Sequence, residues 1–306
     1  MKTDSNLEKV LDAGQFAVTA EIGPPQSSNP EPLIHHAKMM KGSADAFNLT
    51  DNQTAVVRLS SIASAAIIMK EGLEPVIQMT CRDRNRIALQ SDLLGACAIG
   101  VKNVLCLTGD HQTFGNEKAA KSVFDFDSVS ELYTFDRLRR EGLQSGGEVI
   151  EDRPQVYLGC AENPFATPFE FRATRLSKKV NAGADFVQTQ AIFDMDMFES
   201  WMEEVRSRGL DKKVHILAGL IPMKTAGAAR YMKNKVPGMI VPNYIIDRMK
   251  NASDPKEEGL KLCVEQIEAV RNIKGVHGVH IMAVRWEEMV PRIVEMAGLL
   301  PRPTFN

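Results

Sequence analysis

The sequence has few cysteines, and their spacing argues against several classes of protein. The 306 residues include five, an odd number with no CxxC pair, at Cys81, Cys97, Cys106, Cys160 and Cys263. This pattern does not suit a disulfide-stapled secreted fold, an internal iron–sulfur cluster or a structural zinc site. We therefore expect a protein of a reducing compartment, the cytoplasm.

Long hydrophobic runs and an excess of one charge are also missing. No stretch approaches the roughly 18 apolar residues of a membrane span. Residues 1–16 alternate charges with leucine and valine, which is typical of a short amphipathic helix rather than a signal peptide. Lys and Arg number 37 against 39 Asp and Glu, so we expect no general attraction to nucleic acid or to anionic membranes. A local basic cluster (Arg82, Arg84 and Arg86) is interpreted as the solvated start of a helix.

Motifs of nucleotide, acyl-transfer and metal chemistry are absent. The sequence has neither the GxxxxGK[ST] of a P-loop nor the GxSxG of a nucleophile elbow. Where an open dinucleotide-binding sheet carries GxGxxG after its first strand, this chain has EIGPPQSSNP. His111 follows Asp110 directly, but no second His or Cys stands at ligand spacing, so we expect no metal site.

Short apolar runs rich in β-branched residues recur along the chain, and helical periodicity follows each of them. Most begin about 30 residues apart, the length of one strand–helix unit. They show little alternation, which indicates strands covered on both faces and hence parallel pairing. The runs are 16–23, 46–52, 75–81, 103–110, 155–163, 186–193, 215–222 and 278–284.

Eight strand–helix units predict a single (β/α)₈ TIM barrel that spans residues 1–306 as one domain. An extra N-terminal helix precedes it, and an additional helix at about 255–272 precedes the last strand. The segment 111–129 is polar and lengthens the connection after the fourth strand, as expected of a functional loop. An open doubly wound sheet is the alternative fold.

Polar residues interrupt the carboxyl ends of seven of the predicted strands. The carboxyl ends of barrel strands converge on one face, and active sites of TIM barrels lie there. Burying so many polar groups without partners would cost about 1–3 kcal/mol each, which favours a ligand site over a structural role. The residues are Glu21, Thr50, Asp51, Asn52, Gln78, Thr80, Thr108, Asp110, Glu162, Asn163, Gln188, Gln190 and Arg285.

Among these residues, Glu21 gives the most specific indication of a chemical role. Apolar surroundings raise the pKa of a glutamic acid, whose ordinary value is about 4.3, because the charged form loses its water. A glutamic acid with a pKa of about 6–7 can hold a proton at neutral pH and deliver it as a general acid. Pro24 and Pro25 would fix the backbone beyond it. The alternative is a carboxylate paired with an arginine at the rim.

Two further groups of residues suit a flat, anionic ligand. Asp110 ends a strand, and Gly109 before it would let the backbone approach a ring closely. Arg172, Arg175 and Lys179 share one face of a predicted helix and could hold phosphate. The alternatives are a turn or cap at Asp110 and a solvated face for the helix.

Several motifs together resemble the methylenetetrahydrofolate reductase family of flavin-dependent barrel enzymes. They are TAEIGPP, LTDNQ, LTGDH, KKVNAGADFVQTQAIFD and VHIMAVRWEE, within about residues 16–300 and in the order of the family. The chain looks most like the short bacterial branch of one-carbon and acetyl-synthesis pathways. The resemblance implies reduction of 5,10-methylenetetrahydrofolate to 5-methyltetrahydrofolate.

The resemblance also implies roles for individual residues. Glu21 matches the general acid that opens the folate ring to an iminium cation, and Asp110 matches an aspartate near flavin and pterin. Gln190 matches a substrate-binding glutamine, and Arg285 an arginine reaching toward the folate tail. The cofactor-binding residues predicted in this way and from the strand ends are Thr50, Asp51, Gln78, Thr108, Gly109, Asp110, Cys160, Asn163, Arg172, Arg175 and Lys179.

The sequence departs from the family at four predicted cofactor-binding positions and at Ala226. Gln78 stands where a family histidine is found, Thr108 where an arginine is, Asn163 near a family histidine and Arg172 where an aspartate often binds the far half of FAD. Ala226 stands where an aromatic residue often stacks on the ligand. FMN is therefore an alternative to FAD, and a cysteine-rich iron–sulfur partner subunit an alternative to NAD(P)H as electron donor.

The sequence leaves two other functions open. One is a pterin-binding methyltransferase barrel without flavin, and the other is a flavin electron-relay subunit of a larger complex. It does not decide whether the chain forms a homo-oligomer or a hetero-oligomer.

Overall fold

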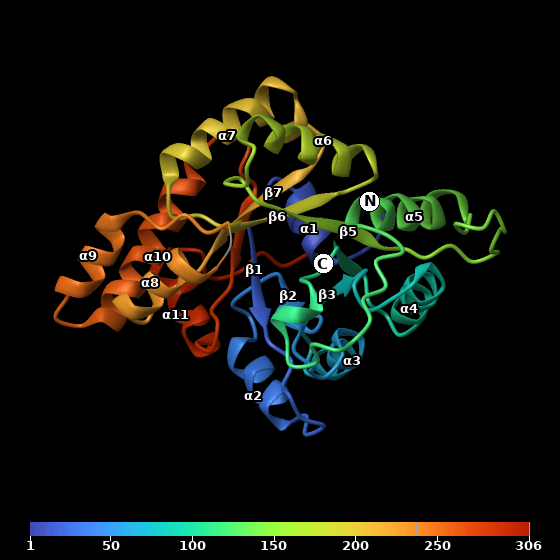
Figure 1. The fold of residues 1–306 in the computed structure, drawn as a ribbon, viewed down its shortest axis with the longest axis horizontal. Coiled ribbons are helices and arrows are strands. Elements are labelled where there is room, and N and C mark those ends of the chain that lie inside the picture. Colours follow the sequence, from blue (N-terminus) through green and yellow to red (C-terminus); the bar gives the residue numbers. More distant parts are fainter. Residues whose placement is uncertain (237, 306) are drawn as a thin grey trace.

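Eight parallel strands close into a barrel in the order of the sequence, β1 to β8 (Figure 1). The computed structural model describes residues 1–236 and 238–305. The barrel confirms the predicted (β/α)₈ fold, and every predicted run contains one strand. The strands are β1 Ala17–Ile22, β2 Ala46–Leu49, β3 Pro75–Thr80, β4 Asn103–Leu107, β5 Tyr157–Glu162, β6 Phe186–Ala191, β7 His215–Leu220 and β8 Gly278–Ile281.

Helices surround the barrel and connect successive strands (Figure 1). The predicted helix before the last strand is α10, and α9 is a further helix that the sequence analysis did not predict. Among the described residues, no helix is both long and apolar enough to cross a bilayer. The helices are α1 Asn6–Asp12, α2 Glu31–Met40, α3 Ser61–Lys70, α4 Arg86–Ala98, α5 Ser128–Glu141, α6 Arg172–Asn181, α7 Met195–Ser207, α8 Ala226–Lys235, α9 Asn243–Asn251, α10 Pro255–Arg271 and α11 Val290–Met296.

The predicted N-terminal helix, α1, closes the end of the barrel where the strands begin. Its apolar residues Leu7, Val10 and Leu11 are buried against the innermost side chains of the strands, including Tyr157 and Phe186. Ser5 caps the helix by accepting a hydrogen bond from the Glu8 amide at 3.1 Å. The opposite end of the barrel is therefore the one available for a ligand.

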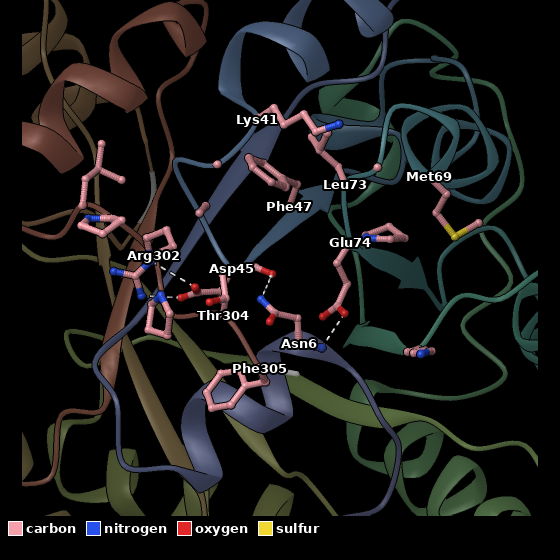
Figure 2. A pocket seen from close by; sticks show the side chains of 18 of the residues that line it. Asn6, Lys41, Asp45, Phe47, Met69, Leu73, Glu74, Arg302, Thr304 and Phe305 are labelled. Carbon is pink, nitrogen blue, oxygen red and sulfur yellow. Dashed lines mark hydrogen bonds and ion pairs between the residues drawn. The ribbon is translucent and has the colours of Figure 1, made fainter.

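Two aspartates stabilise the amino ends of the strands in the same way. Asp45 precedes β2 and accepts a hydrogen bond from the Val18 amide at 2.7 Å, while Asp185 precedes β6 and accepts one from the Leu158 amide at 2.8 Å. Each buried carboxylate also pairs with an arginine, Arg302 for Asp45 (Figure 2) and Arg139 for Asp185. The Asp45 pair ties the C-terminal segment to the base of the barrel.

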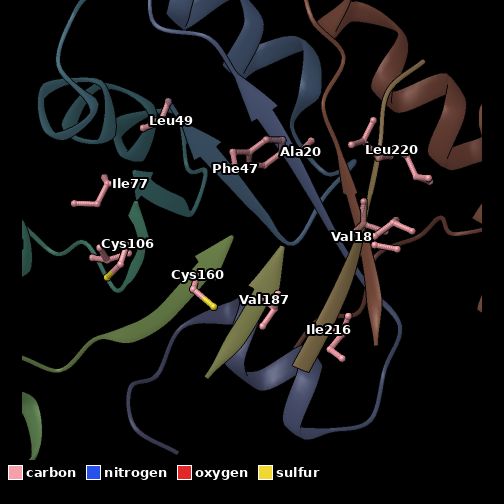
Figure 3. Close-up of a cluster of buried hydrophobic side chains, with 14 of the residues drawn as sticks. Val18, Ala20, Phe47, Leu49, Ile77, Cys106, Cys160, Val187, Ile216 and Leu220 are labelled. Carbon is pink, nitrogen blue, oxygen red and sulfur yellow. The ribbon is translucent and has the colours of Figure 1, made fainter. Parts of the chain in front are cut away.

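Alternation along each strand separates two hydrophobic layers. Val18, Leu49, Ile77 and Val187 point outward into the core between strands and helices (Figure 3). The inward layer at the base of the barrel is filled by larger side chains, and the Tyr157 and Phe186 rings stack there with centroids 5.4 Å apart. Because both faces are covered, the strands are apolar throughout, which is why they could be predicted.

Gly159 on β5 should not tolerate a side chain, because the Phe186 ring fills the space in front of it. A Cβ atom at this position would lie 2.2 Å from Cζ of Phe186. We expect Gly159→Ala to reduce the free energy of unfolding by about 1–3 kcal/mol through overpacking. Urea denaturation measures the change.

The matched control is Gly95→Ala on helix α4, where a Cβ atom would meet nothing within 4 Å. This substitution is expected to stabilise the protein by about 0.5–1 kcal/mol because alanine is the better helix former. Equal effects of the two substitutions would contradict the packing argument.

Candidate active site

The cavity at the carboxyl ends of the strands is the candidate active site. It has a volume of about 470 Å³, within the usual range of about 300–1,000 Å³ for small-molecule sites. A larger hollow of about 1110 Å³ lies at the amino ends, between the C-terminal segment and the loops before β2 and β3 (Figure 2). Conserved chemistry in TIM barrels is built at the carboxyl ends, so the smaller cavity is the relevant one.

Six of the residues that were predicted to act in catalysis or to bind cofactor or substrate line this cavity together. They come from β1, β3, β6, the loop after β5 and helix α6, so segments far apart in the sequence meet at one mouth. The apolar part of the cavity lining comes from Leu105, Leu107 and Met282. The six predicted residues are Glu21, Gln78, Asn163, Arg175, Lys179 and Gln190.

Glu21 is a buried carboxyl group at the end of β1. Burial raises its pKa to about 7, and the nearby Glu287 carboxylate adds to the rise. The Gln53 amide and, to a smaller extent, the Arg58 guanidinium act in the opposite direction. Arg58 donates to the Pro24 carbonyl at 3.1 Å, so it holds the chain just beyond Glu21. Glu21 therefore carries a proton near neutral pH, as an acid catalyst requires.

An irregularity in β6 lies where three consecutive residues border the cavity. Gln188 pairs with Leu217 on β7, but Ala191 pairs with Gly219, so β6 contains one extra residue in this interval. The Thr189 hydroxyl accepts a hydrogen bond from the Gly219 amide of β7 at 2.8 Å, and Gln188, Thr189 and Gln190 all border the cavity.

The cavity floor contains a polar network of which the sequence analysis predicted only Gln188. The amides of Asn48 and Gln188 hydrogen-bond each other in both directions, at 2.6 and 2.9 Å. Gln188 Nε2 also donates to Thr19 Oγ1 at 3.1 Å, and that oxygen lies 2.9 Å from Nδ1 of His280. Burial lowers the pKa of His280 to about 3, so its imidazole is neutral.

Lys179 and Arg175, predicted to hold phosphate, already share a carboxylate. Glu162 Oε2 lies 3.2 Å from Nζ of Lys179, and Glu162 Oε1 lies 3.7 Å from Nε of Arg175. The Lys179 ammonium also donates to the Ala161 carbonyl. The group carries two positive charges against one negative charge, so it retains attraction for an anion.

The basic cluster near β3 is not the solvated helix start that the sequence indicated. The side chains of Arg82 and Arg84 are 3% and 13% exposed, and Arg86 alone is half exposed at 51%. Arg84 pairs with Asp51 at 2.5 Å, and the Asp51 carboxylate also accepts the Thr80 amide at 2.9 Å. Asp51, a predicted cofactor-binding residue, is therefore engaged by protein groups.

Asp110 lies at the same rim but on the exposed loop after β4. Its carbonyl accepts a hydrogen bond from Arg82 at 3.1 Å, and Arg82 also donates to the Asn52 carbonyl at 3.3 Å. Gly109 has φ +90°, and an added Cβ would lie 3.1 Å from the Cβ atoms of Thr80 and Arg82. Arg82 thus joins the loops that follow β2 and β4.

Five other predicted residues lie outside the cavity lining. The Thr108 hydroxyl accepts the Ser128 amide at 3.1 Å, and the buried Thr50 hydroxyl has no hydrogen-bond partner among the described residues. The exposed Arg285 has φ 54°, and its carbonyl accepts from Lys224. The other two are Cys160 and Arg172.

The side chains of Cys160 and Arg172 are committed to packing rather than to the cavity. Cys160 points outward into the core between strands and helices, because Gly159 and Ala161 take the inward positions of β5 (Figure 3). Arg172 is buried at the start of α6, where it donates to the Pro164 carbonyl at 2.7 Å and the Phe169 carbonyl at 2.8 Å.

The sequence analysis also missed His280, Gln53 and Glu287, of which His280 left a signal in the sequence. His280 is a polar residue inside an apolar run, at the inward position that pairs with Thr19. Gln53 and Glu287 lie in short 3₁₀ turns after β2 and β8, where no periodic pattern points to the cavity.

Comparison with known proteins agrees with this geometry. A family model described as "Methylenetetrahydrofolate reductase" matches residues 6–298. The chain is 23% identical over 309 residues to "Probable methylenetetrahydrofolate reductase (NADPH)" of Caenorhabditis elegans, covering 96% of this chain and 44% of that one. It is 22% identical over 313 residues to "Methylenetetrahydrofolate reductase (NADH) 1" of Arabidopsis thaliana, covering 98% and 51%. The chain thus spans about half the length of these relatives.

Among the solved structures with a similar fold is one that matches nearly the whole chain. It is an uncharacterised protein from Clostridium thermocellum that binds two copies of 5-methyl-5,6,7,8-tetrahydrofolic acid. The TM-score is 0.70 at 14% identity, and the match covers 96% of this chain and 100% of that one. Since the family model accounts for nearly every element of the barrel, the chain belongs to the methylenetetrahydrofolate reductase family.

Proposed function

We propose that the protein reduces 5,10-methylenetetrahydrofolate to 5-methyltetrahydrofolate with a bound flavin. The observation that carries the proposal is Glu21, a buried carboxyl group at the mouth of the barrel with a pKa of about 7. Membership of the family supports it, and the product of this reaction is the ligand of the Clostridium thermocellum protein.

The residues of the cavity fit a flavin. Leu105, Leu107 and Met282 offer apolar surface to a ring, and the amides of Gln78 and Gln190 match its carbonyl and N–H groups. The positive charge around Lys179 suits the phosphate of FAD, or of FMN as the alternative. A bound flavin supplies the hydride that reduces the methylene carbon.

The chain itself supplies a proton and holds the folate. Protonated Glu21 delivers its proton to a nitrogen of the five-membered folate ring, the ring opens, and the methylene carbon becomes an iminium that can accept a hydride. Gln190 orients the pterin from β6. Asp110 and Arg285 extend from the rim and contact the folate, Arg285 toward its tail.

The source of electrons is NAD(P)H or a reduced partner protein. The two relatives carry NADPH and NADH in their names. The cysteines of this chain are free, and four of the five are buried. A donor that passes single electrons would therefore bring its own iron–sulfur clusters as a separate, cysteine-rich subunit.

The test of this proposal uses the purified protein. We expect a yellow protein whose flavin, identified by mass after extraction, is bleached by reductant and recovers its colour with 5,10-methylenetetrahydrofolate but not with tetrahydrofolate. NADH, NADPH and a reduced ferredoxin are compared as reductants. A colourless protein that takes up no flavin would overturn the proposal in favour of a methyltransferase, and a flavin that folate cannot reoxidise would favour an electron relay.

A further inference from the structure

One polar atom on the floor of the cavity lacks a protein partner. His280 is 3% exposed and lines the cavity from β8. Its Nδ1 lies 2.9 Å from Thr19 Oγ1 on the neighbouring strand β1, so the opposite edge of the ring, with Nε2, faces away from that strand. Among the residues that the structure describes, Nε2 has no hydrogen-bond partner.

The groups around His280 are already satisfied by one another. Gln188 exchanges hydrogen bonds with Asn48 and donates to Thr19, which uses both of its amide hydrogens and its oxygen. Nε2 of His280 is not one of the fully buried polar atoms without a partner, so it is open to the cavity, where a ligand can hydrogen-bond it.

His280 and its Nε2 atom lie deeper in the barrel than Glu21, as seen from the mouth. Thr19 pairs with His280 across β1 and β8, and Glu21 is the next inward residue of β1. Two residues of a strand span roughly 6.6 Å, so the histidine lies about one layer deeper in the barrel than the acid. A ring inserted from the mouth past Glu21 reaches the histidine with its leading edge.

We propose that His280 is a ligand-binding residue whose Nε2 hydrogen-bonds the polar edge of the ring system in the cavity, with Thr19 and Gln188 fixing its orientation. The group that His280 would bind is the edge of a pyrimidine ring, with its carbonyl and ring nitrogen. The isoalloxazine of flavin and the pterin of folate both contain such an edge. The identity of the ligand rests on the proposed function.

The experiment compares His280→Leu, which removes the nitrogen, with His280→Gln, whose amide can replace Nε2. Binding of flavin to apoprotein and of 5-methyltetrahydrofolate are titrated separately by fluorescence. We expect His280→Leu to weaken binding of one of the two rings by about tenfold, and His280→Gln to restore it to within about threefold. The ring affected identifies the ligand.

Thr19→Val keeps the histidine but removes the hydroxyl that holds it, and it should weaken binding of the same ring. His35→Leu on the exposed face of α2 is the control and should leave both affinities unchanged. If every variant folds and binds both rings like the wild type, the role assigned to His280 is wrong while the proposed function stands. Wild-type protein that binds neither ring overturns both.

Discussion

Replacing Glu21 with glutamine is expected to slow reduction of 5,10-methylenetetrahydrofolate by about 10²–10⁴-fold, the usual contribution of a general acid. Glutamine preserves the size and hydrogen bonding of the side chain but cannot release a proton to the folate ring. Flavin reduction by the electron donor does not require this proton, so it should continue at the wild-type rate. Stopped-flow absorbance follows the two half-reactions separately.

The pH dependence of the rate offers a second readout. With the pKa of Glu21 at about 7, the protonated acid is depleted as pH rises above neutrality, and the wild-type rate of folate reduction should fall there. The residual rate of Glu21→Gln should lack this decline. Glu131→Gln is the matched control, because Glu131 is a buried carboxyl group on α5, in contact with Cys81 instead of the cavity. A control as slow as Glu21→Gln would contradict a role specific to Glu21.

The same pKa shift affects stability with a defined sign. The pKa of Glu21 is about 7 in the folded protein against 4.5 when unperturbed, so between these values the folded state binds more protons than the unfolded state. Stability therefore falls as pH rises through this window, by about 3 kcal/mol in total. Glu21→Gln should be more stable than the wild type at pH 8 and similar to it at pH 4.

Asp185→Asn is expected to reduce the free energy of unfolding by about 3–5 kcal/mol. The Asp185 side chain is 1% exposed and pairs with the buried guanidinium of Arg139, which would lose one of its two carboxylate partners and keep only Asp136. Lys2 of the N-terminal segment would lose its partner as well. Equilibrium unfolding in guanidinium chloride measures the change.

Asp45→Asn at the equivalent position before β2 should have a comparable effect, because it removes the partner of Arg302. The control is Asp4→Asn, whose ion pair with Lys102 is exposed and is expected to contribute less than about 1 kcal/mol. If Asp185→Asn unfolds at the same denaturant concentration as Asp4→Asn, these carboxylates do not stabilise the base of the barrel.

The strands and the acid could be predicted because each leaves a local signal. A strand covered on both faces is a continuous apolar run, and Glu21 is conspicuous as a charged residue within one. The ion pair of Asp51 with Arg84 leaves no such signal, because its two members are 33 residues apart and meet only when β2 and β3 pair. Because the partner of Arg84 is distant in the sequence, the basic cluster resembles a solvated surface when only neighbouring residues are considered.

The direction of side chains was harder to predict than the position of strands. Cys160 belongs to a strand of the site but faces outward, and its apolar neighbours in the sequence do not show which of them face inward. In β6 the register against β7 shifts, and Gln188, Thr189 and Gln190 all border the cavity. Helix α9 was missed because the connection between β7 and α10 has no clear apolar repeat.

The extra residue in β6 gives this site a particular evolutionary constraint. A substitution at Thr189 changes one side chain, whereas deletion of one residue would remove the irregularity and shift the register of the following residues against β7. The chemistry at this wall therefore depends on the number of residues in the strand as well as on their identity. Insertions and deletions are commonly tolerated in surface loops of barrels, but here a change of length acts directly on the residues that border the cavity.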